Sequence, residues 1–115
     1  KLYTGGGDCC VKVFDLRANT AKCLTKLKVH SGPVTCLRVV NDVVFSGSWD
    51  GSLFSYNLSE GAGKRYQAPT MSEPPAVLGV EVVGGMMYGV YRDGNIRAWS
   101  LKGNPEPKPA CLMLA

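Results

Sequence analysis

Three copies of one short pattern recur along this chain at nearly constant spacing. In each copy an Asp is followed six positions later by an aromatic residue, in the pairs Asp8 and Phe14, Asp50 and Tyr56, and Asp93 and Trp99. Asp50 follows Asp8 by 42 positions, and Asp93 follows Asp50 by 43. A fixed period of this length indicates a repeat architecture in which each copy folds as the same small unit.

Each copy reads as a strand, a tight turn and a second, alternating strand. The three stretches are LYTGGGDCCVKVFDL at 2–16, VVFSGSWDGSLFSYNL at 43–58 and MMYGVYRDGNIRAWSL at 86–101. An additional strand precedes the second and third copies, as PVTCLRVV at 33–40 and AVLGVEVV at 76–83. A last strand follows each copy, at 22–29, 63–69 and 109–115. Four short strands in about 40–45 residues are typical of a β-propeller blade.

We therefore predict an all-β chain that forms a partial β-propeller, with blades of four antiparallel strands. Residues 1–29 are expected to form a partial blade with strands b, c and d. Residues 30–72 form a complete blade, and residues 73–115 form a blade with strand d at the C-terminus. Known propellers have at least about four blades, so these are too few for a closed ring. A piece of a longer propeller, a truncated gene model and a self-associating unit all stay open as explanations.

The middle copy resembles the WD-repeat family, with His30 before PVTCL, followed by FSGSWDG and LFSYNL. The resemblance extends over nearly the whole chain, although the copies diverge. The position of the family's Trp-Asp dipeptide holds Phe14-Asp15, Tyr56-Asn57 and Trp99-Ser100. Trp49-Asp50 is therefore not that signature. Asp50 is instead the recurring turn residue, and Trp49 has no counterpart in the other copies.

The resemblance implies a buried hydrogen-bond network beneath each turn, made in this family by a His, a strand-b Ser or Thr, the turn Asp and a strand-c Trp. Such a network satisfies backbone groups that a bend leaves beside a buried face. By position its members are His30, Ser46, Asp50 and Tyr56 in the middle copy, Asp8 in the first, and Asp93 and Trp99 in the third.

Ser46, His30 and Asp50 are also the residue types of a catalytic triad. No nucleophile elbow of the form G-x-S-x-G surrounds Ser46, and the repeat gives all three residues a structural role. We therefore expect no catalytic residue and no enzymatic activity.

Propellers of this family often bind partners through loops at one end of the blades, which implies a protein or peptide partner. By position the contact residues are Trp49, Arg92, Pro33, Thr35 and Leu78. Trp and Arg are enriched among residues that dominate binding energy. A Trp49 that only lies flat on its neighbouring loop is the alternative.

The first third of the chain is basic, which favours RNA or another nucleic acid as the alternative partner. Its cations are Lys12, Arg17, Lys22, Lys26 and Lys28. Lysines that protect exposed strand edges explain the same bias.

Five Cys without a C-x-x-C pair, and a single His, predict no metal site and no cofactor. Unpaired cysteines and the lack of a long apolar run favour an intracellular protein, cytoplasmic or nuclear, that does not enter a membrane.

Overall fold

The computed structural model describes residues 1–16, 22–67, 74–101 and 110–113, and its regular elements there are all β-strands. This confirms the predicted all-β class. The strands are β1 (Leu2–Gly5), β2 (Cys10–Asp15), β3 (Lys22–Lys28), β4 (Val34–Val40), β5 (Val43–Ser48), β6 (Leu53–Asn57), β7 (Ala62–Tyr66), β8 (Val77–Val83), β9 (Met86–Tyr91), β10 (Asn95–Ser100) and β11 (Ala110–Met113).

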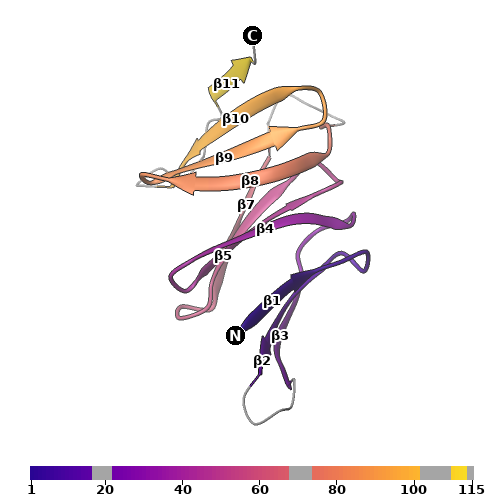
Figure 1. Cartoon of the computed structure of the whole chain (residues 1–115), viewed down its shortest axis with the longest axis vertical. Coiled ribbons are helices and arrows are strands. Elements are labelled where there is room, and N and C mark those ends of the chain that lie inside the picture. The colour runs from indigo at the N-terminus through magenta and orange to yellow at the C-terminus, as the bar shows by residue number, and fades with distance from the viewer. Residues whose placement is uncertain (17–21, 68–73, 102–109, 114–115) are drawn as a thin grey trace.

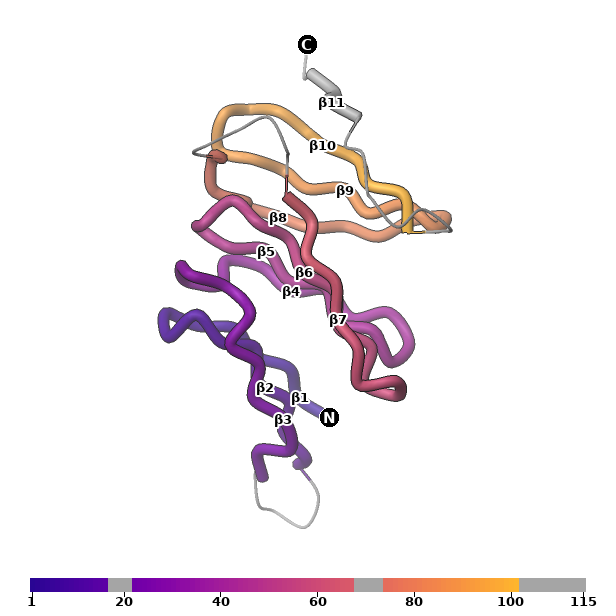
Figure 2. Tube along the Cα trace, turned by 180° about the vertical axis from the view of Figure 1, so that it is seen from behind, coloured from indigo at the N-terminus to yellow at the C-terminus, as the bar shows by residue number. Residues whose placement is uncertain are grey.

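The strands form three antiparallel sheets, which we call the first, second and third sheet. The first sheet has the order β1-β2-β3, the second β4-β5-β6-β7 and the third β11-β10-β9-β8. The sheets follow one another along the long axis of the molecule (Figure 1), and the view from behind shows the same succession (Figure 2). Within the described residues the sheets do not close into a ring, as predicted. The predicted unit boundaries after residues 29 and 72 stay predictions.

The turn after each recurring Asp requires one residue in the left-handed region of backbone space. Gly51 and Gly94 occupy it in the second and third sheets, with φ of 86° and 87°. Glycine meets this requirement without steric cost. In the first sheet Cys9 holds the same position with φ of 68°, so the turn keeps its geometry even without glycine.

The main core lies between the second and third sheets. It is formed by Phe45, Leu53, Tyr66, Val77, Met87, Tyr91 and Trp99. Trp99 is fully buried, and its ring meets that of Tyr66 edge to face, with 5.8 Å between centroids. Burial of each large side chain contributes about 1.5–3 kcal/mol, so this interface fixes the two sheets against each other.

Two glycines at equivalent positions let consecutive sheets approach closely. A Cβ built on Gly5 would lie 2.5 Å from Val34 Cγ1, and a Cβ on Gly47 would lie 2.6 Å from Val77 Cγ1. Val34 and Val77 begin β4 and β8, the first strand and an edge strand of the next sheet in each case. The same contact therefore joins the first sheet to the second and the second to the third.

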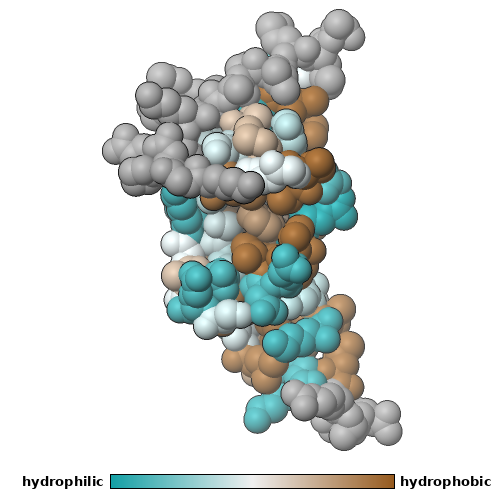
Figure 3. All heavy atoms as spheres, turned by 90° about the vertical axis from the view of Figure 1, so that its left-hand side faces the viewer, coloured by the Kyte–Doolittle hydropathy of each residue, from teal (hydrophilic) through white to brown (hydrophobic). Residues whose placement is uncertain are grey.

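Large apolar side chains reach the surface at both ends of the stack. Leu2 and Leu24 of the first sheet are exposed, as are Val83 and Val90 of the third. Figure 3 shows hydrophobic atoms at the lower end of the molecule, over the first sheet.

Candidate interaction site

Each recurring Asp holds its turn through the backbone N–H two residues further on. Asp8 accepts from Cys10 at 3.2 Å, Asp50 from Ser52 at 2.8 Å and Asp93 from Asn95 at 3.0 Å. The remaining partners differ between the sheets, so the same turn is supported in three different ways.

In the second sheet, His30 joins a buried polar network. Its Nε2 lies 2.8 Å from Ser46 Oγ and its Nδ1 lies 2.9 Å from Ser52 Oγ. Ser52 Oγ donates to Asp50 Oδ1 at 2.6 Å. A hydroxyl that donates to the carboxylate must accept from His30, which assigns the imidazole proton to Nδ1. Ser46 then donates to Nε2.

The expected membership of this network needs one correction. Among the described residues no hydrogen bond joins the Tyr56 hydroxyl to His30, Ser46 or Asp50. Ser52 takes the linking role instead, because the direct distance from His30 Nδ1 to Asp50 Oδ2 is 3.7 Å. Arg65 from β7 also reaches the network, donating to Ser52 Oγ at 3.2 Å and to the Val29 carbonyl. In the sequence, Ser52 two positions after Asp50 is the feature that could have indicated this arrangement.

The surroundings of His30 and Asp50 move their pKa values in the same direction. Burial lowers the pKa of His30, an effect that the charge of Asp50 partly offsets, so the imidazole is neutral at pH 7. Burial alone would raise the pKa of Asp50. Hydrogen bonds from Ser52 and from the Ser31 N–H outweigh it and lower the value to about 2. The network thus joins a carboxylate to a neutral imidazole through neutral hydroxyls, with the guanidinium of Arg65 at its edge, 3.9 Å from Asp50 Oδ2.

The third sheet replaces this network with an aromatic ring and a cation. The position of Ser46 is held by Gly89, and the ring of Tyr91 occupies the space, 2.9 Å from where a Cβ would stand. The guanidinium of Arg97 lies 4.4 Å from that ring's centroid and donates to Asp93 at 3.1 Å. Arg97 is buried, with 7% of its surface exposed.

Contrary to the prediction, Trp99 does not take part in a hydrogen-bond network. Its indole N–H is buried and makes no hydrogen bond of ordinary geometry with a described residue. Gly89 offers no hydroxyl to the indole, and the ring packs within the main core. Burial also raises the pKa of the Tyr91 hydroxyl beside it.

The first sheet supports its Asp with a lysine. Lys12 Nζ lies 2.9 Å from Asp8 Oδ2, and this pair lowers the pKa of Asp8. Lys12 and Lys26 are register partners on β2 and β3. Lys22, Lys26 and Lys28 are exposed, whereas Arg17 lies outside the described residues.

Trp49 and Arg92 lie together where the second and third sheets meet. The backbone N–H of Trp49 donates to Pro33 at 3.0 Å, and that of Arg92 donates to Ala76 at 2.9 Å. These equivalent bonds hold the two residues at the same end of their sheets. The guanidinium of Arg92 lies 5.0 Å from the centroid of the Trp49 ring, and 51% of Trp49 is exposed. The pair therefore forms an exposed cation–π contact between sheets.

Thr35 and Leu78 occupy β-bulges at equivalent places in β4 and β8. The register shifts between Val34 and Cys36 in one sheet and between Val77 and Gly79 in the other. A bulge turns its extra side chain away from the regular faces of a sheet. Leu78 is 49% exposed. The single hydroxyl proton of Thr35 is within hydrogen-bond reach of the carbonyl oxygens of Gly47 and Val77, so the hydroxyl already has an internal partner.

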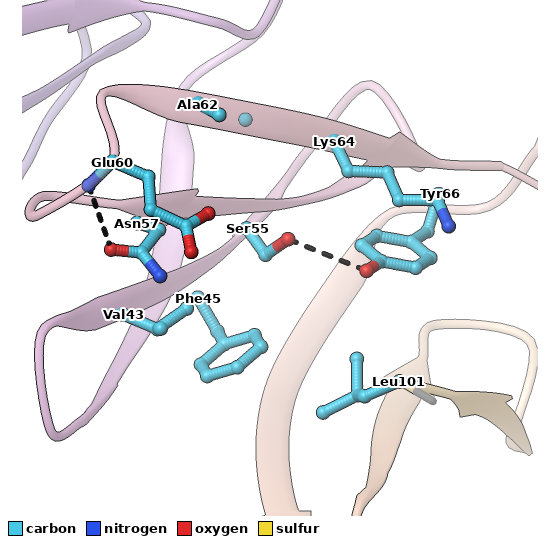
Figure 4. A pocket seen from close by; sticks show the side chains of 10 residues that line it. Val43, Phe45, Ser55, Asn57, Glu60, Ala62, Lys64, Tyr66 and Leu101 are labelled. Atoms are coloured by element: carbon cyan, nitrogen blue, oxygen red, sulfur yellow. Dashed lines mark hydrogen bonds between the residues drawn. The ribbon is translucent and has the colours of Figure 1, made fainter. Parts of the chain in front are cut away.

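A separate cavity of about 380 Å³ lies on β5, β6 and β7 and extends to Leu101 (Figure 4). Val43, Phe45 and Leu101 give it apolar walls. Tyr66 contributes its hydroxyl, 3.3 Å from Ser55 Oγ. This cavity could not be predicted from the sequence, because its walls come from strands with ordinary alternation.

In the described part of the chain, no group of three or more His, Cys, Asp or Glu residues is arranged to hold a metal ion. No helix there is long and apolar enough to cross a membrane.

Consecutive four-stranded antiparallel sheets, in contact through their first strands and each with a recurring Asp in the same turn, are blades of a β-propeller. Residues 21–57 match the family model described as "WD domain, G-beta repeat". Human kinesin-like protein KIF21A is 31% identical over 108 residues, which cover 87% of this chain and 6% of that protein. Residues 21–57 are therefore a WD repeat, and the chain is similar to WD-repeat propellers over most of its length.

Solved structures agree on the fold. Sqt1 from Chaetomium thermophilum superposes with a TM-score of 0.73 and 23% identity, over 93% of this chain and 30% of that one. The same protein bound to the N-terminus of ribosomal protein L10 gives a TM-score of 0.73 and 24% identity, over 88% and 28%. The chain therefore spans about a third of these propellers and a small part of the kinesin-like relative.

Proposed function

We propose that this WD-repeat chain is a non-catalytic interaction module that binds a protein or peptide through the loop face of Trp49 and Arg92. The observation that carries the proposal is the half-exposed indole of Trp49, held against a guanidinium from the next sheet. Large aromatic and Arg side chains dominate binding energy at interfaces, and this pair is already ordered. Pro33 and Leu78 supply exposed surface beside it. The Sqt1 structure with the L10 N-terminus gives a precedent for peptide binding by such a fold.

The non-catalytic part of the proposal rests on access. Ser46 is 2% exposed and His30 is 4% exposed. Both ring nitrogens of His30 have hydroxyl partners within the network. A triad needs a nucleophile that a substrate can reach, and these residues lack such a path.

The test selects a phage-displayed random dodecapeptide library on the 115-residue chain and measures binding of the selected peptides by fluorescence anisotropy. Trp49→Ala should weaken binding of selected peptides by about tenfold or more, as expected for an interface anchor. Val83→Ala is the matched control, because Val83 is an exposed apolar side chain at another place. Equal loss in both variants, or no loss in Trp49→Ala, would refute the proposed face.

Nucleic acid remains the alternative partner, favoured by the exposed Lys26 and Lys28 on β3. Binding through phosphates loses affinity steeply as salt rises. A titration with oligodeoxythymidine across a salt series distinguishes the two. Tight, salt-sensitive binding that is unaffected by Trp49→Ala would favour the nucleic-acid function over the peptide function.

A further inference from the structure

The charges around the recurring turns are largely paired within the molecule. Asp8 is paired with Lys12 and Asp93 with Arg97, at 2.9 and 3.1 Å. Asp50 accepts from Ser31 and Ser52. These carboxylates are therefore already engaged and contribute little to attracting a cationic partner.

Arg92 differs from these charges. Among the described residues no carboxylate lies within ion-pair distance of it, and its side chain lies over the ring of Trp49. Arg38, another exposed arginine, is by contrast paired with Glu81. The loop face thus presents a cation whose charge the described part of the chain leaves uncompensated.

The contact with the Trp49 ring orients the guanidinium of Arg92 so that it can bind an anion. A planar guanidinium over an aromatic face keeps its N–H donors in the plane, where a carboxylate can approach. The contact with Trp49 also limits the rotamers of Arg92, so less conformational entropy is lost on binding. The exposed part of the indole offers apolar surface directly beside these donors.

We propose that the Trp49–Arg92 pair recognises an acidic peptide segment, with an Asp or Glu carboxylate on Arg92 and a neighbouring apolar side chain on Trp49. This inference rests on the proposed peptide-binding function and specifies its ligand. A phosphorylated peptide is less well matched, because phosphate recognition generally uses clusters of arginines. Nucleic acid would need several cations along a backbone, and the exposed lysines on β3 belong to the first sheet.

The experiment uses the dodecapeptides that bind wild-type chain and lose binding in Trp49→Ala. We expect these peptides to carry Asp or Glu at a fixed distance from an apolar residue. Arg92→Gln should weaken their binding by about tenfold, and Arg92→Lys should also weaken it, because a lysine cannot reproduce the planar fork. Arg38→Gln removes the same charge from an exposed, paired arginine and should change binding by less than about twofold.

A double-mutant cycle completes the test. Replacing the peptide's acidic residue by its amide should cost as much as Arg92→Gln, and the two changes together should cost no more than either one. Trp49-dependent peptides without acidic residues, or equal effects of Arg92→Gln and Arg38→Gln, would overturn this inference and leave the proposed function standing. Absence of any Trp49-dependent peptide would overturn both.

Discussion

The second and third sheets hold the same turn with different chemistry. In the second, Asp50 is connected to a neutral His30 through the hydroxyl of Ser52. In the third, Asp93 pairs with a buried Arg97, which stacks on Tyr91. The turn Asp and its backbone hydrogen bond are therefore the features that both sheets keep. The groups beneath the turn can be a histidine and two serines in a hydrogen-bonded network, or a buried arginine over an aromatic ring.

The largest expected loss of stability comes from breaking the pair between Asp93 and the buried Arg97 in the third sheet. Asp93→Ala should lower the free energy of unfolding by about 3 kcal/mol, because it removes the carboxylate that pairs with the buried guanidinium of Arg97. This value is at the low end for buried pairs, since the side chain of Asp93 is 31% exposed and water can enter. Asp50→Ala should cost less, about 2 kcal/mol, because its donors are mostly neutral. Urea unfolding monitored by tryptophan fluorescence measures both.

The double variant Asp93→Ala/Arg97→Met sharpens this result. Replacing both members of a buried pair by apolar groups is often nearly neutral, so the double variant should be more stable than Asp93→Ala alone. If Asp93→Ala costs less than Asp50→Ala, or if Arg97→Met gives no recovery, the third sheet does not depend on its ion pair as described.

The second prediction concerns Gly89, which lies in the third sheet at the position that Ser46 holds in the second. Gly89→Ser should cost about 2 kcal/mol, because its Cβ would lie 2.9 Å from Tyr91 and 3.0 Å from Leu53. Gly79→Ser is the control, since a Cβ there meets Val90 at an ordinary 3.8 Å. In a Tyr91→Ser background the cost of Gly89→Ser should fall, because the ring that it meets is gone. An unchanged cost in that background would contradict the role given to Tyr91.

The sequence predicted much of the fold because the repeat is regular. The period, the Asp positions and the strand alternation all follow from local backbone requirements that a sequence records directly. The pairing of His30 with Ser46 followed from the family resemblance. These features depend on single positions within one repeat unit.

Other features depend on how side chains fill space and could not be predicted. The Tyr91 ring fills the place beside Gly89 as part of a core that also contains Leu53 of the preceding sheet. Ser52 links His30 to Asp50 because His30 Nδ1 lies 3.7 Å from Asp50 Oδ2, and this distance cannot be predicted from the spacing of residues in the sequence. The stacking of Arg92 on Trp49 joins residues of different sheets, and sequence analysis placed both on one face without indicating contact.

The third prediction compares two buried hydroxyls. Ser46→Ala should cost about 1.5 kcal/mol, because it leaves Nε2 of the buried His30 without its partner. Tyr91→Phe should change the free energy of unfolding by less than about 0.5 kcal/mol, since its hydroxyl makes no hydrogen bond of ordinary geometry with a described residue. The same urea titrations measure both variants. Comparable losses would mean that the third sheet contains a polar network of its own.

The smallest expected effect is a pH dependence that belongs to the second sheet alone. The chain has one His, so a stability change between pH 7 and 5 is expected to report on His30. Its folded pKa is lowered by burial, so the unfolded state takes up the proton first. Stability is therefore complete above the unfolded value of about 6.5 and is lost as the pH falls from there toward the folded pKa.

By linkage, the loss between pH 6.5 and 5.5 is at most about 1 kcal/mol for one group. Asp50 does not interfere, because its pKa of about 2 places its own loss of stability below pH 4. Urea midpoints of wild-type chain at pH 7.5, 6.5 and 5.5 measure the effect, with His30→Gln as the variant that cannot titrate. The variant should show a flat profile over this range. A gain in wild-type stability on acidification would mean that Asp50 holds a protonated imidazole.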